Sequence, residues 1–184
     1  MKQKLGLAGK NVRVGHAGTL DPFASGLLVL LLGRATKLFA FLLSCAKVYL
    51  AQTQFHVATN TGDGTGYITA TRCARNPVPT TVKQLFVSYQ QRTYRQRVPA
   101  FSAAHHAGQR FYHYARRGIA PPVRHKSVVI NWVKLNAYFA RRNQMNFTVS
   151  CGSGCYVRQL VVDLCAELHV LGTTIGLVRT RIGP

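Results

Sequence analysis

Residues 15–26 read GHAGTLDPFASG, a turn of small residues that places Asp21 between a leucine and a proline. The chain of 184 residues has only four acidic side chains, so a carboxylate at this position needs an explanation. The glycines permit unusual backbone angles and a close approach of the backbone to a ligand. An Asp before Pro also commonly caps a turn through its own backbone. The motif alone fits a structural turn and a catalytic carboxylate equally well, and His16 fits a core histidine as well as a functional one.

The composition is strongly basic. Lys and Arg number 24 against four acids, which gives a formal charge of +20, and these residues are spread from Lys2 to Arg181. A compact domain with this charge repels itself unless a polyanion neutralises it. The charge therefore predicts a nucleic-acid partner, and RNA in particular because the chain has no DNA-reading motif. An anionic membrane surface is the less favoured alternative, and the apolar run 27–32 is far shorter than the roughly 20 residues that span a bilayer.

Length and cysteine usage indicate the class of protein. A hydrophobic fraction of 47% in 184 residues suits one globular domain spanning residues 1–184. The five cysteines are odd in number and irregularly spaced, which predicts a reducing compartment, the cytoplasm first of all. The basic, acid-free residues 1–10 are also compatible with a mitochondrial or other organellar address. Cys151 and Cys155 are followed by no second pair, so we expect no metal site.

The first half of the chain has stretches with the periodicity of a helix and stretches with the periodicity of a strand. The run 27–32 is bracketed by Gly26 and Gly33, and we expect it to be a buried strand. Residues 34–46 have the apolar spacing of a helix, whereas residues 48–59 alternate as in a strand. Further helices are expected over 82–91, with Thr81 as N-cap, and over 111–118, closed by Gly118.

The second half of the chain has clear patterns for two strands and one helix. Two strands are expected over 127–139 and 144–150, because both stretches are rich in β-branched and aromatic residues. A helix is expected over 156–169, whose apolar residues form one stripe at Val157, Leu160, Val161, Leu164 and Leu168. Helices that alternate irregularly with strands, some of them consecutive, predict an α+β domain.

Several residues outside the first turn suit chemistry on RNA. Arg158 follows the glycine-rich CGSG at the start of the last helix, where it could pair with a carboxylate and hold it ionised, as a nucleophile requires. Tyr49 and Tyr156 have flat rings of the kind that stack on an unpaired base. Asp21 has no second carboxylate close in sequence for a glycosidase pair, and no phosphate-binding GxxxxGK[ST] loop is present. The residues left as candidates for catalysis or binding are therefore one carboxylate, basic residues and aromatic residues.

The chain resembles the TruB family of tRNA pseudouridine-55 synthases. The stretch around Asp21 resembles the family's Gly-His-x-Gly-x-Leu-Asp-Pro signature, and four further blocks follow in the family's order. They are similar to its Lys-x-Tyr strand with the glycine turn after it, its Gln-x-Pro-Pro-x-Tyr-Ser-Ala segment, its Gly-Thr-Tyr-Ile-Arg helix and its closing Leu-Arg-Arg-Thr-Arg-x-Gly. In this sequence the five blocks are residues 14–38, 46–66, 96–119, 151–169 and 177–184.

The resemblance implies a pseudouridine synthase fold with a mixed, largely antiparallel sheet flanked by helices, and a cofactor-free conversion of uridine to pseudouridine. By matching position, it implies that Asp21 is the catalytic carboxylate, which either adds to the flipped base or assists cleavage through the sugar. Arg158 matches the arginine that pairs with it. Tyr49 matches the tyrosine that stacks on the base and assists proton removal. His16 matches the histidine that opens the T-loop, and Tyr156 and Leu177 match residues of the base pocket.

Departures from the family pattern leave two functions open. This sequence has no Lys-Pro-x-Gly turn before the signature, and we expect a catalytic domain without the RNA-binding PUA domain, either as a fragment or as a short divergent member. Ala46, His105 and His113 replace an Asp, a Lys and a Glu. One hypothesis is an active synthase acting on tRNA. The other is a non-catalytic RNA-binding homologue that assists assembly of a ribosome, for example a mitochondrial one, within a larger ribonucleoprotein. Intact Asp21, Tyr49 and Arg158 favour the enzyme, whereas the missing N-terminal turn and the extreme charge favour the second hypothesis. The family's guide-RNA-dependent branch fits less well.

Overall fold

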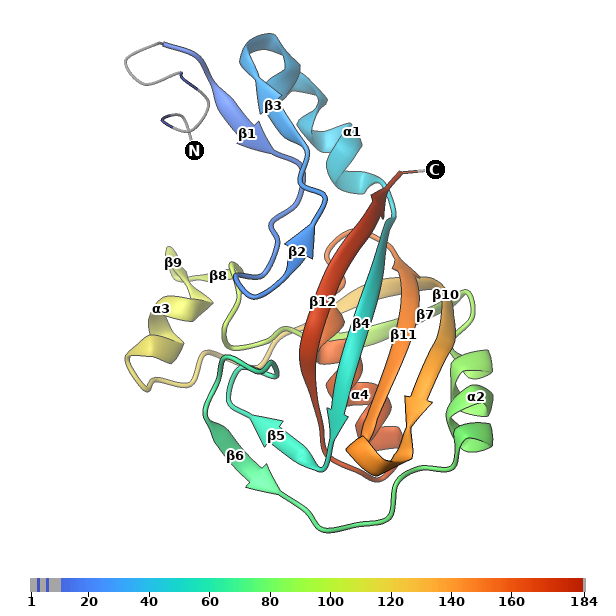
Figure 1. Ribbon diagram of the computed structural model, residues 1–184. Coiled ribbons are helices and arrows are strands. Elements are labelled where there is room, and N and C mark those ends of the chain that lie inside the picture. Colours follow the sequence, from blue (N-terminus) through green and yellow to red (C-terminus); the bar gives the residue numbers. More distant parts are fainter. Residues whose placement is uncertain (1–2, 4–5, 7–10, 184) are drawn as a thin grey trace.

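A six-stranded sheet forms the centre of the computed structural model, which describes residues 3, 6 and 11–183 (Figure 1). Its order is β2 (Ser25–Gly26), β12 (Gly172–Ile182), β4 (Lys47–Phe55), β11 (Gln144–Cys151), β10 (His125–Phe139) and β7 (Arg92–Arg97). All neighbours are antiparallel except β2 and β12, which run parallel. The predicted α+β class with a mixed, largely antiparallel sheet is confirmed.

One face of this sheet is covered by helices α2 (Pro79–Ser88) and α4 (Val157–Glu167). The predicted apolar stripe of α4 is confirmed, since Leu160, Val161 and Leu164 are completely buried against the sheet. Phe86 of α2 meets Phe147 of β11 edge to face, with ring centroids 5.5 Å apart. Figure 1 shows α4 behind the sheet, and no helix of the described residues lies over the opposite face.

Smaller elements surround the sheet. The described residues contain three two-stranded pairs and several short helices. The pairs are β1 (Val14–His16) with β3 (Leu30–Leu32), β5 (Val57–Thr59) with β6 (Ile68–Thr71), and β8 (His105–His106) with β9 (Gln109–Arg110); the short helices are η2 (Gly33–Leu38), α1 (Phe39–Ser44), α3 (Phe111–Arg116) and η3 (Ala140–Arg142). No helix of the described residues is long and apolar enough to cross a membrane.

The expected buried strand over 27–32 is wrong in extent and in burial. Only β3 is a strand there, and it pairs with β1 alone, in a two-stranded sheet that stands away from the main sheet (Figure 1). Leu27 and Leu28 are exposed by 51% and 40% because no other described element packs over them. Leu31 is buried at 4% exposure, so the prediction of burial holds for this leucine but not for the run as a whole.

Other element boundaries also differ from expectation. Thr81 is not an N-cap, because Pro79 starts α2 two residues earlier with its fixed φ and α2 ends at Ser88. The strand expected over 48–59 is split into β4 and β5 at His56, whose φ is +69°. The helix expected over 34–46 is η2 followed by α1. The structure confirms the helix expected at 111–118, which ends at Arg116. It also confirms the two strands of the β10–β11 hairpin, whose ends shift by one or two residues.

Gly26 fixes the contact between the Asp21 turn and β12. Its φ is +101°, and a Cβ there would overlap the backbone of Arg179, its neighbour in β12. We expect Gly26→Ala to lower the free energy of unfolding by about 3 kcal/mol or more, measured by chemical denaturation. Gly33→Ala is the matched control, because Gly33 also has a positive φ but its Cβ would meet nothing within 4 Å. A similar loss of stability in both variants would show that backbone strain alone, rather than the overlap, explains the effect.

Candidate active site

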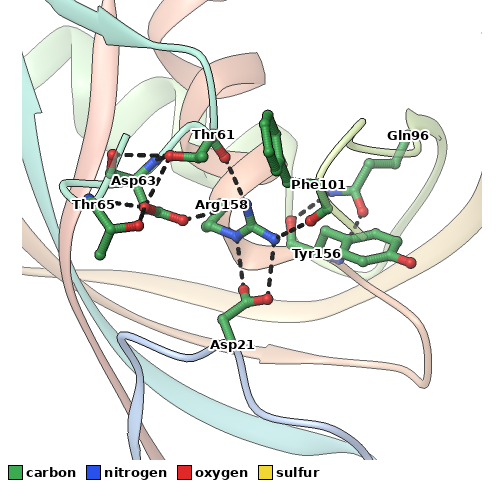
Figure 2. A network of polar contacts seen from close by, with 8 residues as sticks. All are labelled: Asp21, Thr61, Asp63, Thr65, Gln96, Phe101, Tyr156 and Arg158. Atoms are coloured by element: carbon green, nitrogen blue, oxygen red, sulfur yellow. Dashed lines mark hydrogen bonds and ion pairs between the residues drawn. The ribbon is translucent and has the colours of Figure 1, made fainter. Parts of the chain in front are cut away.

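Asp21 lies in the segment between β1 and β2, and its carboxylate faces the first turn of α4. There Arg158 donates from Nε to Oδ2 of Asp21 at 2.7 Å and from Nη2 to Oδ1 at 3.0 Å (Figure 2). This is the two-pronged geometry in which a guanidinium holds a carboxylate most firmly. The ion pair expected between Arg158 and a carboxylate is therefore present, and it joins residues 137 positions apart in sequence.

Arg158 is itself held from several sides. Its side chain is 4% exposed, and its remaining donors reach the carbonyl oxygens of Thr61 at 2.6 Å and Phe101 at 3.0 Å. A buried guanidinium must satisfy its hydrogen-bonding groups, and these contacts do so. Because both carbonyls come from loops outside α4, the arginine joins three loops around the Asp21 carboxylate.

Asp63 is a second carboxylate at the same arginine, which the sequence analysis did not identify. Its Oδ2 is 3.3 Å from Nη1 of Arg158, while its Oδ1 accepts hydrogen bonds from Thr61 and from the backbone and hydroxyl of Thr65. The signal in the sequence was an acid within NTGDGTG in a chain with four acids. The Asp63 side chain is 6% exposed and that of Asp21 is 26% exposed, so only Asp21 is open to a ligand.

Gln96 of β7 positions Tyr156, the residue before α4. Its side-chain oxygen accepts from the Tyr156 amide at 2.8 Å, and its Nε2 donates to the Tyr156 carbonyl at 3.1 Å (Figure 2). Gln96 is 1% exposed, so both bonds form away from water. The amide thus fixes the backbone of Tyr156 and the start of the helix that carries Arg158. Sequence reasoning did not identify this role.

A cavity of about 330 Å³ opens beside Asp21. Four of the expected site residues line it: Asp21, Tyr49, Tyr156 and Leu177. They come from the β1–β2 segment, from β4, from the start of α4 and from β12. Arg158 lies next to the cavity, behind Asp21. The cavity thus combines one accessible carboxylate with two aromatic rings and an aliphatic side chain, which suits a flat, polar ring such as a nucleobase.

The positive charge of the cavity comes from Lys47, Lys126 and Arg179. Arg179 is 1% exposed and donates to the carbonyls of Leu27 and Gly18, so it also holds the Asp21 segment against β12. The Lys47 ammonium donates to three carbonyls at the end of α1, and burial lowers its pKa. Lys126 is exposed. Of the three cations, exposed Lys126 is therefore the one that is available to the phosphate of a bound nucleotide.

Tyr49 lies opposite Arg179 in the sheet, with its ring at the cavity. Burial raises the pKa of its hydroxyl, and a hydrogen bond with Arg179 partly opposes this effect. At neutral pH the hydroxyl therefore keeps its proton, so the side chain offers a stacking surface and a hydrogen-bond donor.

His16 lies outside the cavity lining. It is the last residue of β1, paired with Leu30, and its Nδ1 is buried without a hydrogen-bond partner among residues 3, 6 and 11–183. Cys155 does line the cavity; a hydrogen bond with the Cys151 thiol, and then burial, raise its pKa well above the ordinary value. Within the same described residues, no group of three or more His, Cys, Asp or Glu side chains could hold a metal ion.

Comparison with known proteins places this geometry in context. Residues 2–157 match the TruB family pseudouridylate synthase (N terminal domain). Among curated proteins, the chain is 37% identical over 171 residues to "tRNA pseudouridine synthase B" of Nitrosococcus oceani, covering 93% of this chain and 54% of that protein. It is 36% identical over 175 residues to the protein of that name from Caldicellulosiruptor saccharolyticus, covering 93% and 58%. The chain spans little more than half the length of these relatives.

Two solved structures share the fold. One is described as "Crystal Structure of a Cbf5-Nop10-Gar1 Complex", with a TM-score of 0.66, 24% identity and coverage of 94% of this chain and 41% of that one. The other is described as "Structure of H/ACA RNP bound to a substrate RNA containing 2'-deoxyuridine", with a TM-score of 0.64, 22% identity and coverage of 94% and 39%. At these identities the likeness concerns the fold alone.

Proposed function

The chain belongs to the TruB family of pseudouridylate synthases, and we propose that it isomerises uridine to pseudouridine in RNA, at the T-loop position 55 of tRNA. One observation carries the proposal: a buried arginine holds both oxygens of Asp21 at the edge of a cavity lined by Tyr49 and Tyr156. The name tRNA pseudouridine synthase B, borne by curated relatives at 30–37% identity, supports tRNA as the substrate.

The reaction needs a carboxylate and a shaped cavity. The bond from N1 of uracil to C1′ of the ribose breaks, the uracil rotates, and a bond from C5 to C1′ forms. C5 then loses its proton and N1 gains one, so atoms and electrons balance without a redox partner. In this proposal Asp21 either adds to the base or assists the cleavage through the sugar. Arg158 keeps the carboxylate ionised and aimed into the cavity.

The other site residues bind and orient the base. Tyr49 and Tyr156 provide flat faces for a uridine that has been flipped out of its stack, and Leu177 closes the apolar side. The Tyr49 hydroxyl is protonated in the resting site. To take part in the final proton removal, it must donate its own proton while it accepts the proton that C5 loses. His16 is the last residue of β1 in the β1–β3 pair, and we propose that it acts on the T-loop outside the cavity.

The paired carboxylate and formed cavity favour the enzyme over a non-catalytic homologue that assists ribosome assembly. A protein that only binds RNA does not require an ionised Asp21 at a cavity of the size of a base. Residues 1–184 as one catalytic domain remain a prediction, supported by a single core that α2, α4 and the sheet share. We further propose the cytoplasm as its compartment, because five irregularly spaced cysteines do not suit a disulfide framework.

A T-loop hairpin tests the proposal directly. We expect its target uridine to be converted at moderate salt, and a hairpin with cytidine at that position to stay unmodified. Binding to both hairpins should weaken steeply as salt rises, because phosphate contacts dominate for a chain of charge +20. Conversion is measured by chemical mapping of pseudouridine. A protein that binds both hairpins alike, converts neither and co-sediments with ribosomal precursors would be the assembly factor instead.

A further inference from the structure

No helix of the described residues lies over the face of the six-stranded sheet opposite α4, and the side chains of this face form ordered rows, of which Ser150 and Val48 are buried (Figure 1). Trp132 of β10 and Arg181 of β12 share one row, with Ser150 and Val48 between them; Lys134 and Val178 share the next, with Thr148 and Leu50 between them. Val133 and Leu135 point into the core, so Trp132 and Lys134 point outward. Trp132 is 36% exposed and is the only tryptophan of the chain.

Positive charge on this face is unopposed. None of the six strands contains Asp or Glu. The four carboxylates lie in the Asp21 segment, in the Asp63 turn and on α4. In the described part of the chain, only Arg92 and Arg158 form ion pairs with a carboxylate. Lys134 and Arg181 therefore present free cations on a surface without any acid.

Aromatic rings accompany these cations. Phe139 ends β10 on the same face and is 38% exposed, and the Arg142 guanidinium lies 5.9 Å from its ring centroid. Exposed aromatic residues on a sheet, with cations beside them, are the means by which several RNA-binding folds stack unpaired bases and hold their phosphates. We propose that this sheet face, defined by Trp132, Lys134, Phe139, Arg142 and Arg181, is a second RNA-binding surface that takes single-stranded RNA.

Charge complementarity selects RNA over the alternatives. A second copy of this chain, at +20, would bring like charges together on a face with no carboxylate to offset them. A protein partner would favour a contiguous apolar centre. Val48, Leu50 and Val178 adjoin in the rows of this face, but Trp132 and Phe139 lie near Gln52, Asn136 and Asn146, which can hydrogen-bond to bases and sugars.

The surface is separate from the cavity. Tyr49, Leu177 and Arg179 point to the opposite side of the same strands, toward α4. An RNA segment on the sheet face therefore leaves the cavity free, and the inference does not depend on catalysis.

The single tryptophan makes the surface directly observable. We expect oligouridylate of twelve nucleotides to quench Trp132 emission in a saturable way, even with a T-loop hairpin already bound. In a parallel assay with fluorescently labelled oligouridylate, Trp132→Ala should weaken binding about tenfold and Trp132→Phe only about twofold, because stacking needs a ring. Lys134→Ser with Arg181→Ser should also weaken it about tenfold. Lys83→Ser with Arg117→Ser, which removes the same charge from exposed positions on α2 and at the end of α3, should change it less than threefold.

The inference is overturned if labelled RNA binds while Trp132 emission stays constant, or if the two double variants lose affinity equally. It is also overturned if emission changes only with protein concentration, which would show that a second copy covers the face. Both assays measure binding, so they can be run in Asp21→Asn. Quenching of Trp132 together with no uridine conversion by the unsubstituted protein would support the surface and reject the proposed function.

Discussion

Replacement of Asp21 by asparagine is expected to lower pseudouridine formation by about three orders of magnitude or more, and to change RNA affinity by less than a few-fold. The amide has the shape of the carboxylate and still accepts one hydrogen bond from Arg158. It lacks the ionised oxygen that must add to the base or act through the sugar. Single-turnover conversion of a T-loop hairpin measures the first effect, and filter binding measures the second.

Glu167→Gln is the matched control for this variant. It also removes one negative charge from the chain, but Glu167 lies on α4 beside Arg92 and Tyr89, away from the cavity. We expect its turnover to stay within about twofold of the parent. If Asp21→Asn turned over as fast as this control, Asp21 would serve only to shape its turn.

Local patterns predicted those parts of the fold that local physics determines. The helix from Val157 to Glu167 was recognisable because its apolar side chains recur on one face, and that face is buried. The β10–β11 hairpin was recognisable because both strands are β-branched and aromatic, and Asn143 supplies the left-handed residue that the connection requires.

Burial that depends on a distant partner was not predictable in the same way. The leucines of 27–32 have the composition of a buried strand, but composition does not say what packs against them. In the structure β3 has one neighbouring strand, so Leu32 is 42% exposed. Thr81 failed as an N-cap because Pro79, a residue with its own strong preference for the first turn, lies ahead of it.

The sequence predicted only part of the candidate site, because some of its contacts join residues that are distant in the chain. A resemblance along the chain identifies Asp21, Tyr49 and Arg158 one by one, and their roles remain predictions. It does not reveal that Gln96 binds the backbone of a residue 60 positions away, or that Asp63 shares the arginine with Asp21. Such contacts are set by how the loops meet around α4, which no local periodicity encodes.

Replacement of Arg158 is expected to have the second largest effect. In Arg158→Ala, Asp21 loses both of its hydrogen bonds and the buried Asp63 loses its cation, so two carboxylates are left without a counter-charge. We expect conversion to fall about a hundredfold or more, and the free energy of unfolding to fall by about 3–5 kcal/mol, as when one member of a buried ion pair is removed. Conversion of the T-loop hairpin and urea denaturation measure the two effects.

Arg158→Lys separates charge from geometry. Lysine keeps the positive charge but carries it on one nitrogen, which cannot hold both Asp21 oxygens and also reach the carbonyls of Thr61 and Phe101. We expect conversion to fall at least about tenfold in this variant. Arg92→Lys, at the exposed pair with Glu167, makes the same exchange away from the cavity and should leave turnover unchanged. Full activity in Arg158→Lys would mean that a positive charge near Asp21 is sufficient, and full activity in a folded Arg158→Ala would remove the ion pair from the mechanism.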